Sequence, residues 1–567
     1  MGGSRQETEW IVKETPEGFR EDDAVGGLPR ILRLLLAQRG YSTQEEVEGF
    51  LKPRLKDLGD PFALPEMDKA VERIFRAVDA GEVICIFGDY DVDGITSITI
   101  MRQVLGLYGV TARPFIPVRG GEGYGLSDAA IERLMAEGER PSLLITVDCG
   151  TASKDEIAKL QADGIDVIVA DHHELGGKDR PPGVAVVNPK LGNDYGYLCT
   201  AGVVFKVAHA LLKTRPVAGF DLKELLDLVA VGTIADIVPL VDENRCLVRH
   251  GLRRLPQTSN HGLRALMEVT GMSGLATSAD VGFRIGPRIN AAGRMDAPQD
   301  ALAVLLAESA EAARPLAEQL DDYNRKRQKT ELEMFGEAME QLLKHHDPEK
   351  DPAFLVGSRG WHPGVVGIVA SRLMRAYHKP TFVVAIDDDG LGKGSGRSIE
   401  GVSLVEVIGA CRDDLVVGGG HHMAAGISIR EECMDSFRKN FQKHVLENST
   451  EDQRKARLKI DAVVPFADLS LGFLDSYELL HPFGHSNPQP LFMSKDVWLT
   501  EAPRHLKNKH LKLSLRQDMA ERDAIFFGGG EHELPDPPWD VAFHIDRNVF
   551  RGRTTLQLTV REIRATK

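Results

Sequence analysis

Two kinds of segment, with different spacings of apolar residues, alternate along the first half of the chain. Short runs rich in β-branched residues are separated by stretches in which apolar residues recur every three or four positions, as in 127–138 and 154–164. This alternation predicts βαβ units and a parallel sheet, with functional side chains at the carboxyl ends of the strands. The expected strands are VICIF (83–87), LLITV (143–147), DVIVA (166–170) and VAVVN (184–188).

Other patterns flank this region. Residues 27–80 have the spacing of short helices, and 300–347 form one long helical stretch that Pro315 or Gly336 could interrupt. The last hundred residues carry five short strand patterns separated by turns, which suggests a small barrel of the oligonucleotide-binding type. We expect a multidomain α/β protein with an N-terminal helical cap (1–80), a parallel-sheet domain (81–255), a helical region with a long connecting helix (256–350), a second α/β domain (351–450) and a barrel (457–567).

Composition supports a globular protein of several domains. The 567 residues exceed what one core usually serves, and 42% hydrophobic with 27% charged residues is near the globular average. No apolar run is long enough for a membrane helix, and the start MGGSRQETEW has no secretory pattern, so we expect a cytoplasmic protein. The 6 cysteines include no CxxC pair, which argues against a disulfide framework and a zinc ribbon.

The charge balance alone argues weakly against a nucleic-acid partner. Lys plus Arg number 69 against 84 Asp plus Glu, a formal charge of −15 that would repel an anionic polymer. A cluster of carboxylates around metal ions would reverse that field locally. The position of the acidic residues therefore matters more than their number.

Three carboxylates follow the first predicted strand directly. VICIF runs into GDYDVDG, which places Asp89, Asp91 and Asp93 on a Gly-flanked turn. Such crowding is repulsive without a cation. A solvated acidic turn and a calcium loop are the alternatives, but the twelfth position of an EF-hand loop would need Glu and is Ile100 here.

Further polar residues follow other apolar segments. LLITV ends at Asp148, DVIVA is followed shortly by His172 and His173, and the apolar helix LLDLVAVGTIA ends at Asp236. Singly, each strand-end Asp could cap the next helix and the His pair could be a hydrogen-bonded core pair. Because the carboxyl ends of parallel strands share one edge, their joint arrival favours a metal site.

These motifs resemble those of a known superfamily. GDYDVDG, VDCG, ADHHEL and GTIADIVPL, in this order, are similar to the motifs of the DHH phosphoesterase superfamily, and within it to the bacterial exonucleases specific for single-stranded DNA. The resemblance extends over about residues 30–565. Its further motifs are EGYGL (122–126), RINAAGR (288–294), WHPGVVGIVASR (361–372), GSGRS (394–398), GGHHMAAG (419–426), which marks the DHH-associated domain, and PFGHSNPQP (482–490), which leads into the barrel.

The resemblance implies a site with two divalent ions. Asp91 would bind one ion, Asp148 would bridge both, and the other would be held by Asp93, His172 and Asp236; Asp89 and His173 complete the catalytic set. Many members carry His where this chain has Phe87, so Asp89 is the candidate replacement at the first ion. Mixed imidazole and carboxylate ligands favour Mn²⁺, with Mg²⁺ as the alternative.

The remaining motifs predict contacts to DNA. Ser395 and Arg397 lie in GSGRS, interpreted as a Gly-rich turn that holds a terminal phosphate. The basic stretch RHLKNKHLK (504–512) is a candidate positive patch between barrel strands. The predicted DNA-binding residues are Arg119, Tyr124, Arg288, Arg294, His362, Ser395, Arg397, His421, Lys507, Lys509 and Lys512.

The resemblance implies a metal-dependent exonuclease that degrades single-stranded DNA from the 5′ end to mononucleotides, in recombination and repair. It would act as a monomer, with a single-strand-binding protein and a helicase as candidate partners. A phosphodiesterase of short oligoribonucleotides or cyclic dinucleotides is the main alternative, although such relatives generally lack the barrel. A pyrophosphatase is disfavoured by GGHHMAAG, and a scaffold without activity by the complete set of predicted ligands.

Overall fold

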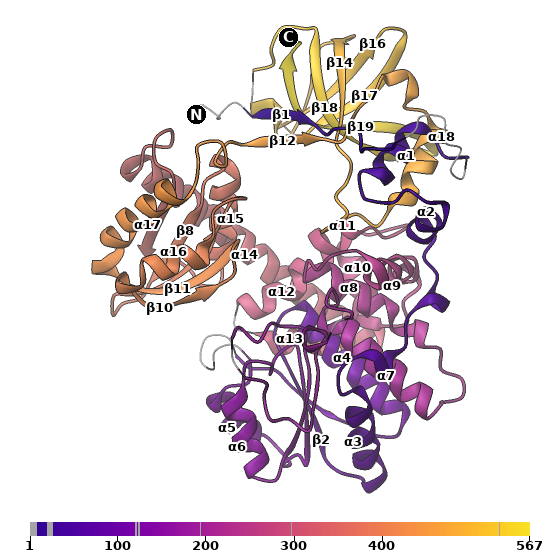
Figure 1. Cartoon of the computed structure of the whole chain (residues 1–567), viewed down its shortest axis with the longest axis vertical. Coiled ribbons are helices and arrows are strands. Elements are labelled where there is room, and N and C mark those ends of the chain that lie inside the picture. Colours follow the sequence, from indigo (N-terminus) through magenta and orange to yellow (C-terminus); the bar gives the residue numbers. More distant parts are fainter. Residues whose placement is uncertain are drawn as a thin grey trace. The chain divides into compact units, whose positions relative to one another are not determined.

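The computed structural model describes residues 8–19, 27–118, 122, 125–177, 179–192, 194–295, 297–507, 509–531 and 533–566. The chain forms two compact units, shown in Figure 1. The large unit consists mainly of Trp10–Gly286 and Lys459–Lys567, and the small unit mainly of Pro287–Val304 and Glu311–Leu458. Arg119, Gly120, Gly121, Gly123 and Tyr124 lie outside the described residues, so the predictions for Arg119 and Tyr124 do too.

A five-stranded parallel sheet forms the centre of the large unit, in the order β3-β2-β4-β5-β6. Its strands carry almost only buried apolar side chains, because helices cover both faces. This confirms the predicted βαβ architecture. The strands are β2 (Ile84–Gly88), β3 (Arg113–Phe115), β4 (Leu143–Val147), β5 (Asp166–Ala170) and β6 (Ala185–Val187).

The covering helices differ in polarity according to what they contact. Helices α5 (Asp128–Ala136) and α6 (Lys154–Ala162) bury one face against the sheet and expose the other. By contrast α4 (Val92–Leu107) and α8 (Leu226–Ala235) are buried nearly all round, because α4 packs between the sheet, α7 and α8. The other helices of this region are α3 (Met67–Ala80), α7 (Thr200–Thr214), α9 (Asp242–Arg254), α10 (His261–Val269), α11 (Ser278–Asp280) and the π-helix η7 (Val281–Ile285).

The C-terminal strands close into a ring. Strands pair in the order β14-β18-β19-β17-β16, and an additional pairing of β14 with β16 joins the two ends. The five members of the ring are the five strands that the sequence predicts, which confirms the expected barrel. The strands of this region are β13 (Ala462–Val463), β14 (Phe492–Leu499), β15 (Arg504–Leu506), β16 (His510–Gln517), β17 (Ala520–Phe526), β18 (Trp539–Phe550) and β19 (Arg553–Ala565), with helix α18 (Leu471–Tyr477).

The N-terminal helices share a core with the barrel. Apolar side chains of α1 (Arg30–Ala37) and α2 (Gln44–Leu51) pack in one cluster with residues of the barrel strands. The next helix, α3, contacts β6 of the parallel sheet instead. The helical cap predicted at 1–80 is thus distributed over two cores, although its boundary at residue 80 stays a prediction.

A buried arginine connects these parts of the large unit. The guanidinium of Arg245, on α9, donates to the carbonyl oxygens of Phe50, Leu479, Leu480 and His481 at 2.8–3.2 Å. Burial lowers its pKa to about 9. Its five N–H donors thus satisfy backbone carbonyls of α2 and of the segment that leads into the barrel.

Arg245→Ala is expected to lower the melting temperature by about 5 °C or more, since hydrogen bonds to a charged group contribute about 1.5–3 kcal/mol each and several carbonyls would lose their donor. Differential scanning fluorimetry measures this shift. Arg253→Ala is the matched control, because Arg253 is exposed on the same helix. Equal melting temperatures for both variants would contradict a connecting role for Arg245.

The small unit contains the predicted long helix and the second α/β domain. Helix α14 (Ala310–His345) continues through Pro315, which is near its start, and through Gly336; the interruption lies before it, after α13 (Pro298–Leu305). The sheet order is β10-β11-β9-β8-β7. Its elements are β7 (Phe354–Arg359), α15 (Val366–Tyr377), β8 (Thr381–Ile386), β9 (Leu391–Arg397), α16 (Leu404–Ala410), β10 (Leu415–Gly420), β11 (Ala424–Arg430) and α17 (Met434–Asn448), preceded by α12 (Gly286–Arg294).

GSGRS is part of a strand, so its interpretation as a turn is wrong. Residues 394–397 belong to β9, which pairs with β8 and β11. The glycines serve packing: a Cβ on Gly394 would lie 2.7 Å from Ile427 Cγ1, and one on Gly396 would meet the ring of Phe382. Glycine here permits close approach of neighbouring side chains rather than a turn.

The remaining elements are short. None of the described helices is both long and apolar enough to cross a membrane. The 6 cysteines, all described, form no disulfide, and five of them are buried. The short elements are β1 (Glu9–Val12), β12 (Arg457–Ile460) and the 3₁₀ helices η2 (Leu55–Asp57), η3 (Pro61–Ala63), η4 (Pro189–Leu191), η5 (Leu222–Leu225), η6 (Leu255–Gln257), η8 (Arg412–Asp414), η9 (Glu431–Cys433), η10 (Phe466–Asp468), η11 (Glu478–Leu480) and η12 (Gly529–Glu531).

Candidate metal centre and phosphate-binding residues

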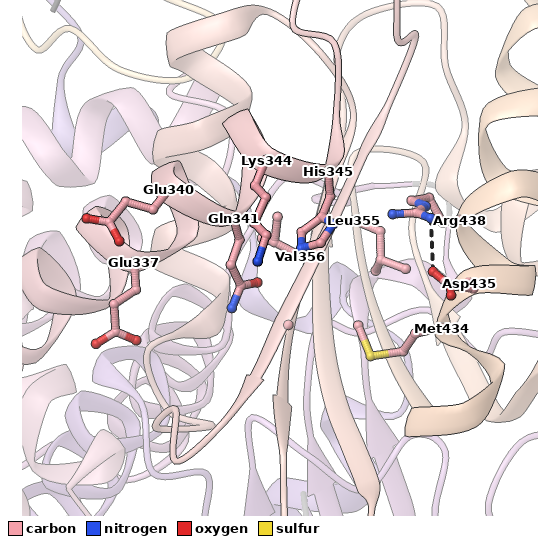
Figure 2. A pocket seen from close by; sticks show the side chains of 11 residues that line it. Glu337, Glu340, Gln341, Lys344, His345, Leu355, Val356, Met434, Asp435 and Arg438 are labelled. Atoms are coloured by element: carbon pink, nitrogen blue, oxygen red, sulfur yellow. Dashed lines mark ion pairs between the residues drawn. The ribbon is translucent and has the colours of Figure 1, made fainter.

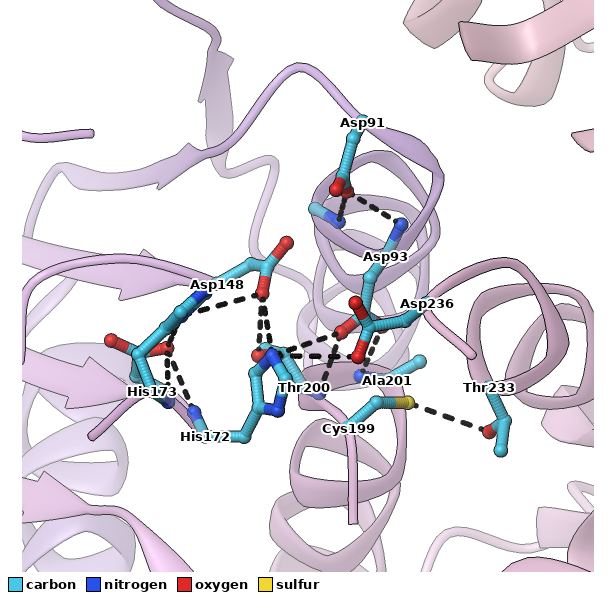
Figure 3. A network of polar contacts seen from close by, with 12 residues as sticks. Asp91, Asp93, Asp148, His172, His173, Cys199, Thr200, Ala201, Thr233 and Asp236 are labelled. Atoms are coloured by element: carbon cyan, nitrogen blue, oxygen red, sulfur yellow. Dashed lines mark hydrogen bonds and ion pairs between the residues drawn. The ribbon is translucent and has the colours of Figure 1, made fainter. Parts of the chain in front are cut away.

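The turn after β2 begins helix α4 with a carboxylate cap. Oδ1 of Asp91 accepts hydrogen bonds from the backbone N–H groups of Asp93 and Gly94, at 2.9 and 3.2 Å (Figure 3). This satisfies N–H groups that the first turn of a helix leaves without partners. A Cβ on Gly94 would collide with the backbone of Asp89, so glycine lets the helix start beside the strand end.

A second helix terminus holds Asp93. Its two carboxylate oxygens accept hydrogen bonds from the backbone N–H groups of Thr200 and Ala201, at 2.7 and 2.8 Å, at the start of α7. The positive end of the helix dipole stabilises this buried charge. Gly232 of α8 lies against it: a Cβ there would be 3.0 Å from Asp93 Oδ1, so glycine brings α8 close to the site.

Asp148 follows β4 in a left-handed backbone conformation. Its φ of 62° is uncommon for a residue other than glycine, and non-glycine residues in this region often mark functional sites. Thr200 Oγ1 donates to Asp148 Oδ1 at 2.9 Å. Nε2 of His172 lies 3.5 Å from the same oxygen, so Asp148 is within reach of both the imidazole and the α7 terminus (Figure 3).

Asp236 ends helix α8 and completes the cluster. Its Oδ2 lies 3.6 Å from His172 Nε2. A carboxylate at a helix C-terminus faces the negative end of the dipole, which is unfavourable unless a cation is close. Within the described part of the chain, Oδ2 of Asp236 and Nε2 of His172 are buried without a hydrogen-bond partner.

Asp171 contacts both histidines and is absent from the predicted site. Its Oδ1 accepts from the backbone N–H groups of His172 and His173 and lies 2.7 Å from His173 Nδ1. Burial alone would raise the pKa of Asp171, but the hydrogen bond with His173 leaves it lowered. The same contact outweighs burial at His173 and raises its pKa to about 9. The sequence feature that could have identified Asp171 is its position between the strand DVIVA and the two histidines.

Burial and mutual repulsion shift the pKa values of the clustered side chains. Burial, together with the charge of Asp91, raises the pKa of Asp93 to about 7. Burial and the charge of Asp93 likewise raise the pKa of Asp236 to about 8 and that of Asp148 well above its usual value. Burial lowers the pKa of His172 to about 4, which keeps its imidazole neutral, the form that binds metals.

The ligand atoms form overlapping groups of the size that metal ions require. In each of three groups the atoms lie within 4.8 Å of one another. Asp148 belongs to two groups and His172 to two, so neighbouring ions could share ligands. The groups are Asp89, Asp91 and Asp148; Asp93, His172 and Asp236; and Asp148, His172 and His173. The donor set fits divalent ions, and Asp89 groups with Asp91 and Asp148, while its replacement of the ligand missing at Phe87 stays a prediction.

Two of the predicted phosphate contacts lie together in the small unit. Arg397 Nη1 donates to Ser395 Oγ at 2.9 Å, and both side chains reach the first turn of α15. A Cβ on Gly367 would be 3.0 Å from Ser395 Oγ and 3.1 Å from Arg397 Nη2. Burial lowers the pKa of the Arg397 guanidinium. A helix N-terminus with a hydroxyl and a desolvated arginine suits a phosphate group.

Other predicted contacts have structural partners. Arg288 forms an ion pair with Asp321 of α14, with Nη2 to Oδ1 at 2.7 Å. Arg294 Nη1 donates to the carbonyl of Gly364 at 3.0 Å, and His362 Nδ1 accepts from the Gly364 N–H at 3.1 Å. His421 is exposed just after β10, where its N–H donates to Ala424 at 2.8 Å.

The basic stretch 504–512 is a β-hairpin. Lys507 and Lys509 are exposed at its turn, between β15 and β16. Lys512 lies within β16, with its Nζ 3.3 Å from Asp523 Oδ2. The two turn lysines are therefore the more accessible part of the predicted patch.

A cavity of about 550 Å³ in the small unit involves none of the predicted residues (Figure 2). Side chains of α14 and α17 line it beside β7, among them Glu337, Lys344 and Arg438. Arg438 pairs with Asp435 at 2.9 Å. The carboxylates Glu337, Glu340 and Asp435 outnumber Lys344 and Arg438 in the lining, so this cavity shows no preference for an anionic ligand.

Comparisons with known proteins agree with this arrangement. Three family models match: the DHH family, N-terminal domain, over residues 83–233; the DHHA1 domain over 351–447; and the RecJ OB domain over 460–562. The single-stranded-DNA-specific exonuclease RecJ of Bacillus subtilis is 36% identical over 537 residues, covering 93% of this chain and 67% of the relative. That of Dickeya dadantii is 35% identical over 571 residues, covering 96% and 97%.

Solved structures give the same result. The crystal structure of RecJ from Thermus thermophilus in complex with Mn²⁺ has a TM-score of 0.83 and 32% identity, covering 99% of this chain and 80% of that chain. The corresponding structure in complex with Mg²⁺ has a TM-score of 0.78 and 31% identity, covering 99% and 79%. The similarity thus includes all parts of the chain rather than one domain.

Proposed function

Because this chain belongs to the family of the single-stranded-DNA-specific exonuclease RecJ, we propose that it hydrolyses single-stranded DNA from the 5′ end and releases mononucleotides. The observation that carries the proposal is the cluster of overlapping ligand groups around Asp148 and His172. The cluster combines with a second α/β domain and a barrel, as in the relatives.

The cluster is assigned two divalent cations, with Mn²⁺ preferred over Mg²⁺ because of the imidazole ligand. Asp89 and Asp91 would hold one ion, Asp93, His172 and Asp236 the other, and Asp148 both. When bound, such ions polarise the scissile phosphate, lower the pKa of water and stabilise the leaving oxygen.

The protein itself positions the reacting groups. The termini of α4 and α7 fix Asp91 and Asp93 through backbone hydrogen bonds, so these carboxylates need little reorganisation. Asp171 orients His173, since its Oδ1 lies 2.7 Å from His173 Nδ1. We assign His173 a hydrogen bond to the substrate phosphate, since a charged donor there stabilises negative charge.

The predicted DNA contacts complete the proposal. Ser395 and Arg397 would bind the 5′ phosphate at the N-terminus of α15, while Arg288, Arg294, His362 and His421 would contact the strand. Arg119 and Tyr124, which follow β3 in the sequence and lie outside the described residues, are assigned the same task on the resemblance alone. The barrel, with Lys507, Lys509 and Lys512, would add affinity without chemistry.

The hairpin lysines provide a separate prediction. Replacing Lys507, Lys509 and Lys512 together by alanine should flatten the plot of log affinity against log salt by up to about two units, at about 0.7 per phosphate contact. Turnover at saturating DNA should change little, because these residues are remote in sequence from all proposed metal ligands. Fluorescence anisotropy with labelled single strands at several salt concentrations measures the slope.

A control for the loss of three positive charges is a variant with three other lysines replaced. Lys52, Lys56 and Lys223 are exposed in the large unit outside the barrel. Their joint replacement by alanine should leave the slope within error of the wild-type value. An unchanged slope for the hairpin variant would mean that the strand does not pass over this hairpin.

The substrate assay tests the proposed function itself. Purified protein with Mn²⁺ is incubated with end-labelled single-stranded DNA, duplex DNA, short RNA and cyclic di-AMP. Loss of the 5′ label from single strands, abolished by EDTA, is the expected result. A preference for cyclic dinucleotides or for RNA of a few nucleotides would contradict it, and would favour the oligonucleotide phosphodiesterase.

The cellular setting belongs to the proposal as well. We expect a monomer in the cytoplasm that acts in recombination and repair, with a single-strand-binding protein and a helicase as partners. Both would supply single strands, which is the only form of DNA that the proposed activity uses. Size-exclusion chromatography with light scattering tests the monomer.

A further inference from the structure

A cavity of about 360 Å³ lies in the large unit where helix α8 ends. Residues of the end of α8 and the loop after it form one wall, α11 and η7 the second, and the segment before the barrel the third. The cavity is called the Phe283 pocket below. Its lining includes Thr233, Ile237, Ser278, Phe283, Phe483, His485 and Gln489.

Two large apolar side chains of this pocket are exposed. Phe283 is 79% and Ile237 69% accessible, and both line the same cavity, so together they form an exposed apolar surface beside it. Phe283 lies on the π-helix η7, a rare element that frequently occurs at functional sites. An exposed aromatic on such an element suggests binding.

The loop beside the pocket has a strained backbone that contacts with the segment before the barrel hold in place. Ile237 has a φ of 60°, a genuine outlier for a β-branched residue. Neighbouring contacts hold this loop: Leu240 N–H donates to the carbonyl of His485 at 2.9 Å, and a Cβ on Gly484 would lie 2.7 Å from Leu240 Cδ1. The segment PFGHSNPQP therefore packs closely on the loop after Asp236.

The chemistry of the lining excludes a phosphate and favours an uncharged ring. Among the described residues that line the pocket, none is Lys or Arg, and Asp546 is the only acid. Aromatic and aliphatic side chains make up the larger part of the lining, and its uncharged polar groups are Thr233, Thr277, Ser278, His481, His485 and Gln489. A volume of about 360 Å³ is within the range of about 300–1,000 Å³ that holds small ligands.

The position of the Phe283 pocket limits which uncharged ring could be its ligand. Ile237 directly follows the proposed metal ligand Asp236, and Thr233 lies one turn earlier on the same helix (Figure 3). The pocket therefore adjoins, along α8, the segment that carries Asp236, and a substrate strand held at the metal centre is the ligand that this position offers. Nucleobases are flat, uncharged and attached within a few bonds of each phosphate.

We propose that the Phe283 pocket binds one nucleobase of the single-stranded substrate, within a few nucleotides of the bond that is cleaved, by stacking on Phe283 beside Ile237. The proposal rests on the proposed function and adds a base-binding subsite to it. Stacking on an aromatic ring accepts every base, so the site holds the strand in register without selecting a sequence.

The test combines a protein variant with abasic DNA. Affinities for single strands with one abasic site, moved stepwise from the 5′ end, are measured by anisotropy with Ca²⁺ in place of Mn²⁺ to slow hydrolysis. Wild-type protein should lose about 5- to 100-fold affinity at one position near the 5′ end. Phe283→Ala should bind intact DNA more weakly by a similar factor and lose the sensitivity at that position alone.

Two further variants make the result specific. Phe283→Trp should restore both the affinity and the positional sensitivity, and Phe62→Ala, which removes an exposed ring on η3 against Lys213, should behave as wild type. An unchanged abasic profile in Phe283→Ala would overturn the subsite while leaving the exonuclease proposal intact. Failure of wild-type protein to prefer single strands would instead remove both.

Discussion

Asp148→Ala is expected to reduce hydrolysis of single-stranded DNA by at least about 10³-fold, since removal of one group that stabilises transition-state charge already costs about 10²–10³-fold. Asp148 belongs to two of the three ligand groups, so its loss would disturb both proposed ions. The fold should survive, because burial beside Asp93 raises the pKa of the Asp148 carboxyl and its removal relieves repulsion.

Asp148→Asn is the control for shape. The amide retains the volume of the side chain and can accept the hydrogen bond from Thr200 Oγ1, but it lacks the charge. Both variants should be inactive, and both should lose the increase in melting temperature that Mn²⁺ gives the wild-type protein. An active Asp148→Ala enzyme would contradict the shared-ligand arrangement.

Arg397→Ala is expected to reduce the use of 5′-phosphorylated strands by about 10- to 100-fold, with a small effect on strands that end in a hydroxyl. A hydrogen bond between charged partners contributes about 1.5–3 kcal/mol, and Arg397 is partly buried beside the first turn of α15, which weakens screening by water. The ratio of kcat/KM for the two kinds of strand measures the effect.

Arg430→Ala is the matched control, because Arg430 is an exposed arginine on a neighbouring strand of the same sheet. It should retain the wild-type ratio between phosphorylated and hydroxyl-ended strands. The same ratio in Arg397→Ala would show that another residue recognises the 5′ end.

Much of the metal centre could be predicted because strand ends determine it. The apolar runs define parallel strands, and residues that follow such strands must share one edge. Asp89, Asp91, Asp93, Asp148 and His172 come together for this reason. Asp236 could be predicted from a local conflict, a carboxylate at the end of an entirely apolar helix.

Other features depend on contacts that a linear pattern does not encode. The packing of α1 and α2 on the barrel joins segments more than 400 residues apart, and either segment alone has an ordinary amphipathic pattern. GSGRS has the composition of a turn, yet its glycines allow β9 to pack under Phe382 and Ile427. The exposed Phe283 gave no periodic signal, since its accessibility is a property of the folded chain.

The most direct test of the account is anomalous diffraction at the manganese edge from crystals soaked with Mn²⁺. Two peaks are predicted, one among Asp89, Asp91 and Asp148 and one among Asp93, His172 and Asp236, with Asp148 within bonding distance of both. Peaks elsewhere, or no ordered manganese in this cluster, would contradict the claim that these strand ends form a two-metal centre.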